Sequence, residues 1–203
     1  HAEEINEAKL QFFINISHEI RTPMSLIISP LQKLIVTDKD ENRQQSYGTI
    51  YRNAERILTL INQLMDIRKI DKGQMILKFK EKNIVSLIKE AYNSFDFQAT
   101  SKDISIELTI ESQDMRSWID TKHFDKIIFN LLSNASKYTH GDEGHVELDV
   151  KTNKTYDHII IRVRDNGCGI PKKNMKHLFE RFYDGEYRRF RASGTGIGLA
   201  LTR

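Results

Sequence analysis

Apolar residues recur at helical spacing in two stretches of the first third of the chain. In the first stretch, steps of three or four residues separate Ile16, Ile20, Met24, Ile27, Leu31 and Leu34. In the second stretch, the same steps join Ile50, Ala54, Ile57, Ile61 and Leu64 and continue to Arg68, where the apolar stripe ends. This spacing predicts two amphipathic helices that each bury one stripe. Because the intervening residues 39–42 are polar, the two helices are expected to form a hairpin.

A helical hairpin alone leaves its apolar stripes half covered. The simplest closure is a symmetric dimer, in which two hairpins complete a four-helix bundle with the stripe residues in its core. The alternative is that the hairpin packs on the second half of the same chain. We favour the dimer.

The pattern changes around residues 71–74, and we place the domain boundary between residues 1–72 and 73–203. Beyond the boundary, alternating apolar and polar residues predict strands at 104–110, 146–150 and 159–165. Residues 84–98 and 121–138 have helical spacing instead. These elements predict a mixed sheet covered on one face by helices, so the whole chain is expected to be α+β with two domains.

Composition narrows the class of protein. With 203 residues, 39% hydrophobic and 29% charged, the chain can bury a core without disulfides or metal ions. The net charge of +3 is too small to predict nucleic-acid binding. The single cysteine, Cys168, excludes an internal disulfide and fits a reducing compartment. No apolar run reaches the ~18 residues of a membrane span and no signal peptide opens the chain, so we expect a soluble protein or the soluble part of a longer one.

One histidine in the first predicted helix is a candidate nucleophile. On a helical projection, His18 falls opposite the apolar stripe, so its imidazole is expected to face water. An exposed imidazole with Glu19 beside it is available for nucleophilic chemistry. The alternative is an ordinary surface histidine, and position 18 alone does not separate the two.

Three polar residues share one flank of the predicted helix 121–138. Asn130, Asn134 and Lys137 lie beside an apolar face formed by Phe124, Ile127, Ile128, Leu131, Leu132 and Ala135. Amide oxygens suit Mg²⁺ and a lysine suits phosphate, so this flank is a candidate site for a metal-bound nucleotide. The alternative is that the two asparagines satisfy neighbouring backbone groups.

A carboxylate and a glycine-rich turn follow the last predicted strand. Asp165 is placed on the same face as the apolar residues of strand 159–165, where a carboxylate needs a donor that a purine amino group would supply. The alternative is an aspartate that caps a turn. Gly167 and Gly169, directly after it, allow the backbone to approach a ligand closely.

A second glycine-rich segment lies at residues 194–201. Its glycines, Gly194, Gly196 and Gly198, precede an apolar helical start, and such a segment presents backbone N–H groups to anions. The segment does not match the Walker or dinucleotide-binding patterns. A flexible loop is therefore the alternative.

Five segments together resemble the sequence boxes of sensor histidine kinases, in the order that this family has them. FINISHEIRTP at 13–23 resembles the H box and NLLSNASKYT at 130–139 resembles the N box. DNGCGI at 165–170 and residues 194–201 resemble the two glycine boxes, and FERFY at 179–183 resembles the F box. The wording of the H box is further similar to the kinase core of hybrid two-component regulators.

The resemblance implies a dimerisation and histidine-phosphotransfer domain at 1–72, followed by an ATP-binding domain at 73–203. The second domain would be an α/β sandwich of the Bergerat type, shared by histidine kinases, Hsp90 chaperones and gyrase. In relatives, a helix and further strands follow the second glycine box, so we expect this domain to be truncated at Arg203. Pro23, five residues after His18, is a candidate bend point of the first helix.

The resemblance also implies a role for each matching residue. His18 would be the phosphoacceptor, Glu19 the acid that orients it, and Thr22 the residue that places a water for a reverse phosphatase reaction. In the second domain, Asn134 would bind Mg²⁺ and Asp165 the adenine amino group. The remaining residues would hold the nucleotide or shape its pocket and lid: Asn130, Lys137, Tyr138, Gly167, Gly169, Gly194, Gly196 and Gly198.

The implied function is ATP-dependent autophosphorylation of His18, followed by phosphotransfer to an aspartate of a response-regulator receiver domain, with phosphatase activity. The implied partners are a second copy of the chain and that receiver. Nucleic acid is not among them, and a membrane is reached only through segments outside this chain. The implied location is the cytoplasmic portion of a membrane-anchored sensor kinase.

Two alternatives belong to other classes of protein. A Bergerat ATPase that performs conformational work shares Asn134, Asp165 and the glycines, but it leaves the segment 18–23 unexplained. A dimeric scaffold or pseudokinase is expected to have lost His18, Asn134 or Asp165, and all three are present.

Overall fold

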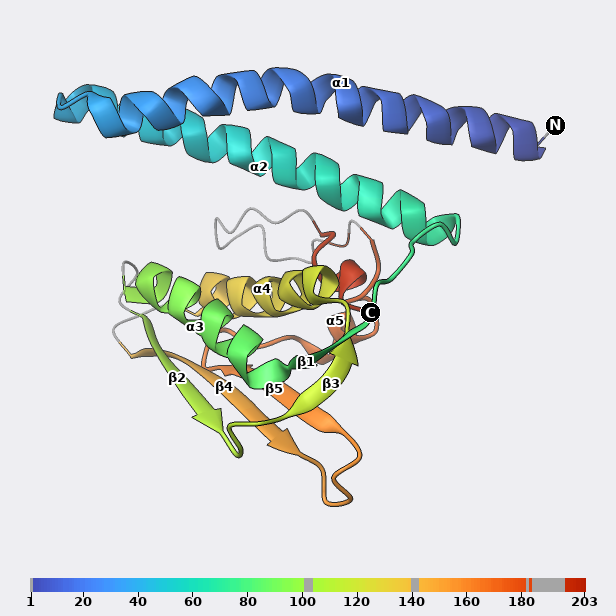
Figure 1. Cartoon of the computed structure of the whole chain (residues 1–203), viewed down its shortest axis with the longest axis vertical. Helices are drawn as coiled ribbons and strands as arrows, with labels where there is room; N and C mark the ends of the chain where they lie inside the picture. Colours follow the sequence, from blue (N-terminus) through green and yellow to red (C-terminus); the bar gives the residue numbers. More distant parts are fainter. Residues whose placement is uncertain (1, 101–103, 140–142, 182, 184–195) are drawn as a thin grey trace. The chain divides into compact units, whose positions relative to one another are not determined.

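The computed structural model describes all residues except 1, 101–103, 140–142, 182 and 184–195 (Figure 1). The chain divides into two compact units, His1–Met75 and Ile76–Arg203. We call them the hairpin unit and the sheet unit and describe each by itself.

The hairpin unit consists of two long helices, α1 (Ala2–Thr37) and α2 (Glu41–Asp71). Helix α1 continues through both Pro23 and Pro30. The turn between the helices is fixed by the carboxylate of Asp38, which accepts hydrogen bonds from Arg43 Nε (2.8 Å), the Asp40 amide (3.0 Å) and the Tyr47 hydroxyl (3.1 Å). These donors hold the pKa of Asp38 at about 2. Asp40 then caps α2 by accepting from the Arg43 amide.

The two helices bury only part of their predicted stripes against each other. Met24 and Ile28 of α1 form a buried cluster with Ala54 of α2, and Ile20, Tyr51 and Leu58 pack against it. The other edge of the stripes stays open: Ile27, Leu34, Ile50 and Ile57 are each between 39% and 49% exposed. Since 3.6 residues make a turn, a stripe of this width has one edge that a single partner helix does not reach.

The sheet unit contains one mixed sheet and one short ribbon. The sheet has the order β2-β4-β5, with β2 (Ile104–Ile110) parallel to β4 (Gly144–Thr152) and β5 (Ile159–Asp165) antiparallel to β4. The ribbon pairs β1 (Lys80–Asn83) with β3 (Arg116–Ile119) in antiparallel fashion. The predicted mixed sheet is confirmed, whereas the ribbon was not predicted.

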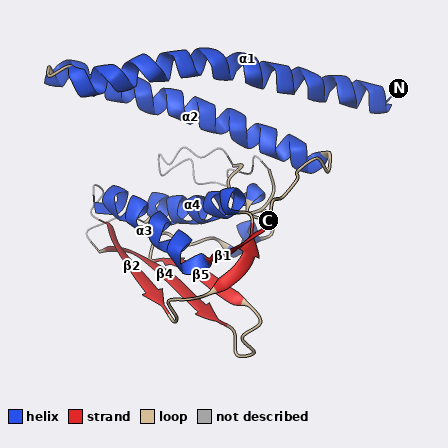
Figure 2. Cartoon of the chain, in the orientation of Figure 1, coloured by secondary structure: helices blue, strands red, loops and turns tan. Residues whose placement is uncertain are grey.

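Two helices, α3 (Ile84–Thr100) and α4 (Thr121–Tyr138), cover one face of the sheet (Figure 2). The short helices α5 (Lys172–Met175) and η2 (Leu199–Leu201) follow the last strand. Alternate residues of β4 point towards the helices and are buried in the core. Its fully buried members are Val85, Ile88, Ile128, Leu132, Val146, Leu148 and Val150. The fold class predicted from the sequence, a helical hairpin followed by a two-layer α/β unit, is confirmed.

The start of the sheet unit is tied to the start of α4. Asp120 caps α4, and its carboxylate accepts hydrogen bonds from the backbone amides of Lys78 (2.7 Å) and His123 (3.1 Å) and contacts His123 Nδ1 (2.8 Å). These contacts, the Lys78 amide foremost, lower the pKa of Asp120.

No helix within the described ranges is both long and apolar enough to cross a membrane.

Candidate functional site

His18 is exposed on α1, as its position opposite the apolar stripe predicts. The neighbouring Ser17 is buried and Met24 lies in the hairpin cluster, so the other side of the helix faces α2. The backbone carbonyl of His18 accepts a hydrogen bond from Thr22 Oγ1 (3.2 Å). Among the described residues no hydrogen bond engages Nε2 of His18, so this nitrogen is open to a reaction partner.

The side chain that approaches the His18 ring is Arg21, a residue to which sequence reasoning gave no role. Its Nη1 lies 3.5 Å from Nδ1 of His18, and its Nη2 donates a 2.8 Å hydrogen bond to Asn62 Oδ1 of α2. The i, i+3 spacing on one helical face was the available signal. Glu19 is exposed, and within the described part of the chain it forms no hydrogen bond or ion pair.

In the sheet unit, the polar flank of α4 meets the second glycine-rich segment. Asn130 Nδ2 donates a 3.1 Å hydrogen bond to the carbonyl oxygen of Gly198. A Cβ on Gly198 would lie 3.4 Å from Asn130 Oδ1, so the two groups are in close contact. Gly196 has a φ of +65°, which a residue with a side chain rarely adopts. Asn134, one turn further along α4, is half-buried and forms no hydrogen bond among the described residues.

The same flank ends in a paired lysine and tyrosine. The Lys137 ammonium donates to the Tyr138 hydroxyl (3.1 Å) and lies 4.7 Å from the centre of the Tyr138 ring. The tyrosine therefore positions a cation at the C-terminal end of α4, where the helix dipole also favours positive charge.

The first glycine-rich turn packs directly on the end of α4. A Cβ at Gly167 would lie 2.2 Å from the carbonyl oxygen of Tyr138 and 2.7 Å from its carbonyl carbon, so only glycine fits. The backbone amide of Cys168 donates to the same carbonyl oxygen at 3.3 Å. Gly169 follows with a φ of +66°. This close approach brings the strand end and the helix end together.

Asp165, at the end of β5, is exposed rather than buried on a core face. The strand alternation places it on the face of Ile161 and Val163, but this face is no longer covered where the strand ends. Its Oδ1 accepts a 3.0 Å hydrogen bond from the Gly167 amide. The backbone therefore provides one hydrogen-bond donor to this carboxylate, for which a purine amino group was the expected donor.

Thr139, the residue after α4, was not singled out from the sequence. It is 1% exposed, and its Oγ1 is buried with no hydrogen-bond partner in the part of the chain that the structure describes. Its backbone amide donates to Ala135 at 3.0 Å and ends the helix. Thr139 thus follows directly on the carbonyl that packs against Gly167.

Some predicted site residues lie outside the described residues. They are Gly194 of the second glycine-rich segment and Phe182 of the FERFY segment. Within the described ranges, no group of three His, Cys, Asp or Glu side chains is arranged to hold a metal ion. A metal ion at this site would be bound by amide oxygens such as that of Asn134 and by the phosphate oxygens of a nucleotide.

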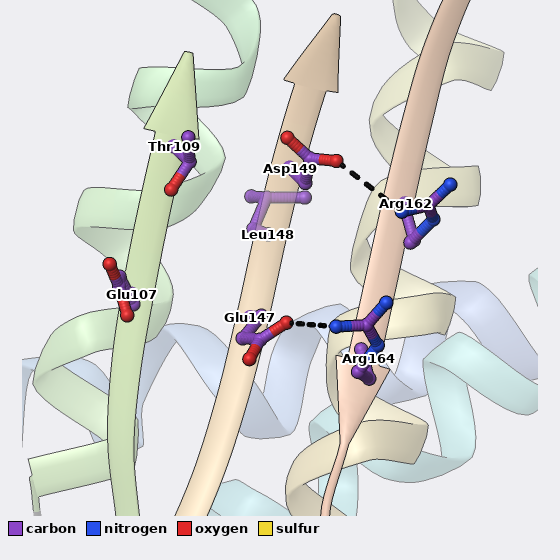
Figure 3. A pocket seen from close by; sticks show the side chains of 7 residues that line it. All are labelled: Glu107, Thr109, Glu147, Leu148, Asp149, Arg162 and Arg164. Atoms are coloured by element: carbon purple, nitrogen blue, oxygen red, sulfur yellow. Dashed lines mark hydrogen bonds and ion pairs between the residues drawn. The ribbon is translucent and has the colours of Figure 1, made fainter.

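The opposite face of the sheet carries a shallow pocket of about 250 Å³ (Figure 3). Its two arginines are already paired, Arg164 with Glu147 at 2.8 Å and Arg162 with Asp149 at 3.7 Å. Glu107 adds a third carboxylate to the lining. Because acidic groups repel phosphate and occupy the arginines, this pocket is a poor candidate for a nucleotide.

The fold and the site together define a class of protein. An exposed histidine on a helical hairpin precedes a two-layer α/β unit in which two glycine-rich segments close on an asparagine-bearing helix. Residues 8–73 match the family described as "His Kinase A (phospho-acceptor) domain". Residues 119–203 match the "Histidine kinase-, DNA gyrase B-, and HSP90-like ATPase" family. The chain belongs to the histidine kinases.

Individual relatives agree with this assignment. The chain is 37% identical over 206 residues to histidine kinase P4 of Formosa agariphila, covering 99% of this chain and 15% of that protein. Full-length ShkA in complex with AMPPNP is similar in structure, with a TM-score of 0.72, 21% identity, and coverage of 94% of this chain and 39% of ShkA. ThkA in complex with the response regulator TrrA has a TM-score of 0.54, 22% identity, and coverage of 85% of this chain and 50% of that one.

Proposed function

We propose that this chain is a sensor kinase core that transfers the γ-phosphoryl group of ATP to His18. The observation that carries the proposal is the exposed His18 imidazole with an open Nε2 in a chain that also holds a glycine-lined ATPase-type unit. In the reaction, the Nε2 lone pair forms a bond to phosphorus while the bond to the bridging oxygen breaks, and ADP leaves. The imidazole then loses its proton to a base or to water.

The tautomer of His18 decides whether Nε2 can attack. Nε2 has a free lone pair only when the ring proton sits on Nδ1, and that proton needs an acceptor. Arg21, at 3.5 Å from Nδ1, can only donate and therefore favours the unreactive tautomer. Glu19 is the proposed acceptor, so autophosphorylation requires Glu19 to replace Arg21 beside the ring.

The nucleotide would bind between α4 and the two glycine-rich segments. The contact of Gly167 with the Tyr138 carbonyl and the positive φ of Gly169 and Gly196 fit a backbone cradle for phosphates and base. Asn134, whose amide oxygen accepts no hydrogen bond from the described residues, suits Mg²⁺, and Asn130 would support the metal and phosphates. Lys137 would offset charge that develops on the phosphates, Tyr138 would lie by the base, and Asp165 would accept from the adenine amino group.

The proposed partners are a second copy of the chain and a receiver domain. The open edge formed by Ile27, Leu34, Ile50 and Ile57 supports a four-helix bundle between two hairpins. The ThkA complex with the response regulator TrrA supports phosphotransfer to a receiver aspartate. The chain spans 15% of the length of the P4 kinase. We propose that it is the cytoplasmic portion of a membrane-anchored sensor kinase.

Radiolabelled ATP tests the phosphoacceptor. With γ-³²P-ATP we expect label that is labile in acid and stable in base, and we expect His18→Gln to abolish it. His158→Gln, which removes an exposed histidine of the β4–β5 hairpin, is the matched control and should label normally. Label that persists in His18→Gln, or that survives acid, would contradict the proposal.

Dephosphorylation of the receiver tests the role of Thr22. We expect Thr22→Ala to accept phosphate and pass it to the receiver, yet to dephosphorylate the receiver slowly, because the hydroxyl that positions the water is gone. In the present structure this hydroxyl donates to the His18 carbonyl, so it must rotate to act. A Thr22→Ala variant with an unchanged rate of receiver dephosphorylation would exclude this role.

A further inference from the structure

We propose that the Thr139 hydroxyl recognises the nucleotide base, and that its missing hydrogen-bond partner arrives with the adenine ring or with a water that the ring holds in place. This inference rests on the proposed ATP site. Thr139 is thereby assigned as a binding residue in addition to Asp165.

The first argument is the cost of the buried hydroxyl. Among the described residues, Oγ1 of Thr139 has no hydrogen-bond partner, although the residue is only 1% exposed. Buried polar groups in native proteins nearly always have a partner, and an exception calls for an explanation such as a ligand or a bound water. Ser136, one turn earlier on α4, is almost as buried at 4% exposed, and it does have an interaction partner. The missing bond is therefore a feature of position 139 and not of the end of α4 in general.

The second argument is the position of Thr139. The Tyr138 carbonyl carbon, to which the Thr139 nitrogen is bonded, would lie 2.7 Å from a Cβ on Gly167. Oδ1 of Asp165 would lie 2.9 Å from the same Cβ. The backbone directly before Thr139 and the proposed base-binding carboxylate therefore both lie close to Gly167.

The third argument is chemical complementarity. The carboxylate of Asp165 can only accept a hydrogen bond, and the adenine amino group can only donate one. The ring nitrogens beside that amino group accept hydrogen bonds, and the Thr139 hydroxyl can donate to one of them directly or through one water. A hydroxyl already removed from bulk water forms this bond without first losing a protein partner.

Thr139→Val separates a binding role from a structural one, because the two roles predict different signs. Valine has nearly the same shape and removes only the unsatisfied hydroxyl. In the nucleotide-free protein we expect the thermal midpoint to rise by about 3 °C. The dissociation constant for ATP, measured by calorimetry, should increase about 3- to 10-fold. Thr139→Ser keeps the hydroxyl and should bind ATP within about twofold of the wild type.

Two controls identify what the hydroxyl recognises. Ser136→Ala removes a buried hydroxyl that has a partner, so it should lower the thermal midpoint of the free protein. Inorganic tripolyphosphate carries the phosphates without the base, and Thr139→Val should leave its competition with ATP for the wild-type site unchanged.

Results that differ from these expectations would contradict the role of Thr139, its recognition of the base, or the proposed function. Equal ATP affinity in wild type and Thr139→Val, or a lower midpoint of the free Thr139→Val protein, would refute the role of Thr139 alone. Weaker binding of tripolyphosphate by Thr139→Val would show that the hydroxyl serves the phosphates or the pocket shape instead of the base. A wild-type chain that binds no ATP would overturn the proposed function, and this inference with it.

Discussion

The two units of this kinase core differ in how completely they bury their own apolar residues. In the sheet unit, Ile88, Leu132, Leu148 and Val150 are wholly removed from solvent between the sheet and its two helices. In the described part of the hairpin unit, the buried cluster consists of Met24, Ile28 and Ala54, and Leu31, Met65 and Ile67 are buried outside it. Other large aliphatic side chains along the same helices stay open. Two helices share one interface, whereas a sheet with two helices forms layers that enclose a volume. The described sheet unit thus encloses its own core, whereas the hairpin unit leaves one edge of its apolar stripes exposed.

The largest effect is expected from a cavity in the complete core. Leu132→Ala should lower the free energy of unfolding of the sheet unit by about 3 kcal/mol, because Leu132 is fully buried in the α4 face of the core. Urea unfolding followed by the fluorescence of Trp118, the single tryptophan, measures this loss. The loss should be the same at all protein concentrations. A dependence on concentration would place part of the core between two chains and contradict the comparison.

The next effect concerns the open edge of the hairpin. Ile27→Asp should prevent association of two chains, because a charge would be buried in the bundle at a cost of about 2 kcal/mol or more per chain. Sedimentation equilibrium measures the change. Val36→Asp is the matched control: Val36 is 83% exposed, and its helical position is on the opposite side of α1 from Ile27. If both variants associate like the wild type, the open edge is not the dimer surface.

The same comparison explains which features could be predicted from the sequence. The strands 104–110 and 159–165 and the helix 121–138 were predicted with the bounds that the structure shows, since each is a strong local periodicity. The ribbon was missed because Lys80–Asn83 is charged and does not alternate, and its partner lies more than thirty residues away at Arg116–Ile119. In the hairpin, Ile28 and not Ile27 is buried, because the contact with α2 lies at one edge of the predicted stripe.

The candidate site was predictable where it depends on glycine. Gly167 follows from its motif, and the 2.2 Å approach to the Tyr138 carbonyl gives the physical reason for it. The contact of Arg21 with His18 is an i, i+3 contact within α1 that the helical spacing could have indicated. The buried hydroxyl of Thr139 depends on packing between segments, for which a single sequence carries no signal. The exposure of Asp165 also depends on where the cover of the sheet ends, and the alternation of β5 does not specify this point.

A smaller effect is expected from a strained turn in the sheet unit. Tyr156, in the hairpin between β4 and β5, has a φ of +58° and is 80% exposed. Its left-handed backbone conformation is therefore strained, and its side chain makes little packing contact that would offset the strain. Tyr156→Gly should raise the free energy of unfolding by up to about 1 kcal/mol. Thermal unfolding checks this, with Tyr156→Ala, which keeps the strain, as control. A destabilised glycine variant would mean that the tyrosine ring makes the larger contribution.

The smallest effect is expected at the turn of the hairpin unit, and it depends on pH. Arg43 holds the pKa of Asp38 at about 2, below its ordinary value of 3.8. A lowered pKa stabilises the folded state above the unfolded value, and this stabilisation is lost as the pH falls from about 4 to about 2. Asp38→Asn should therefore unfold at a lower temperature than the wild type at pH 6, and the difference should shrink towards pH 2. Glu41→Gln, at the same turn, is the control and should show no such convergence. A difference that persists at pH 2 would assign the effect to packing.

The hydrogen bonds on either side of the unit boundary leave only a short covalent connection between the two units. The amides of Lys72, Gly73 and Gln74 all donate to carbonyls in the last turns of α2, and the amide of Lys78 is held by Asp120. The free tether is therefore residues 75–77, which span at most about 11 Å when extended. Under the proposed function, so short a connection limits how far a nucleotide bound to the sheet unit can move away from the hairpin unit. Lengthening the connection should therefore be enough to slow the labelling of His18.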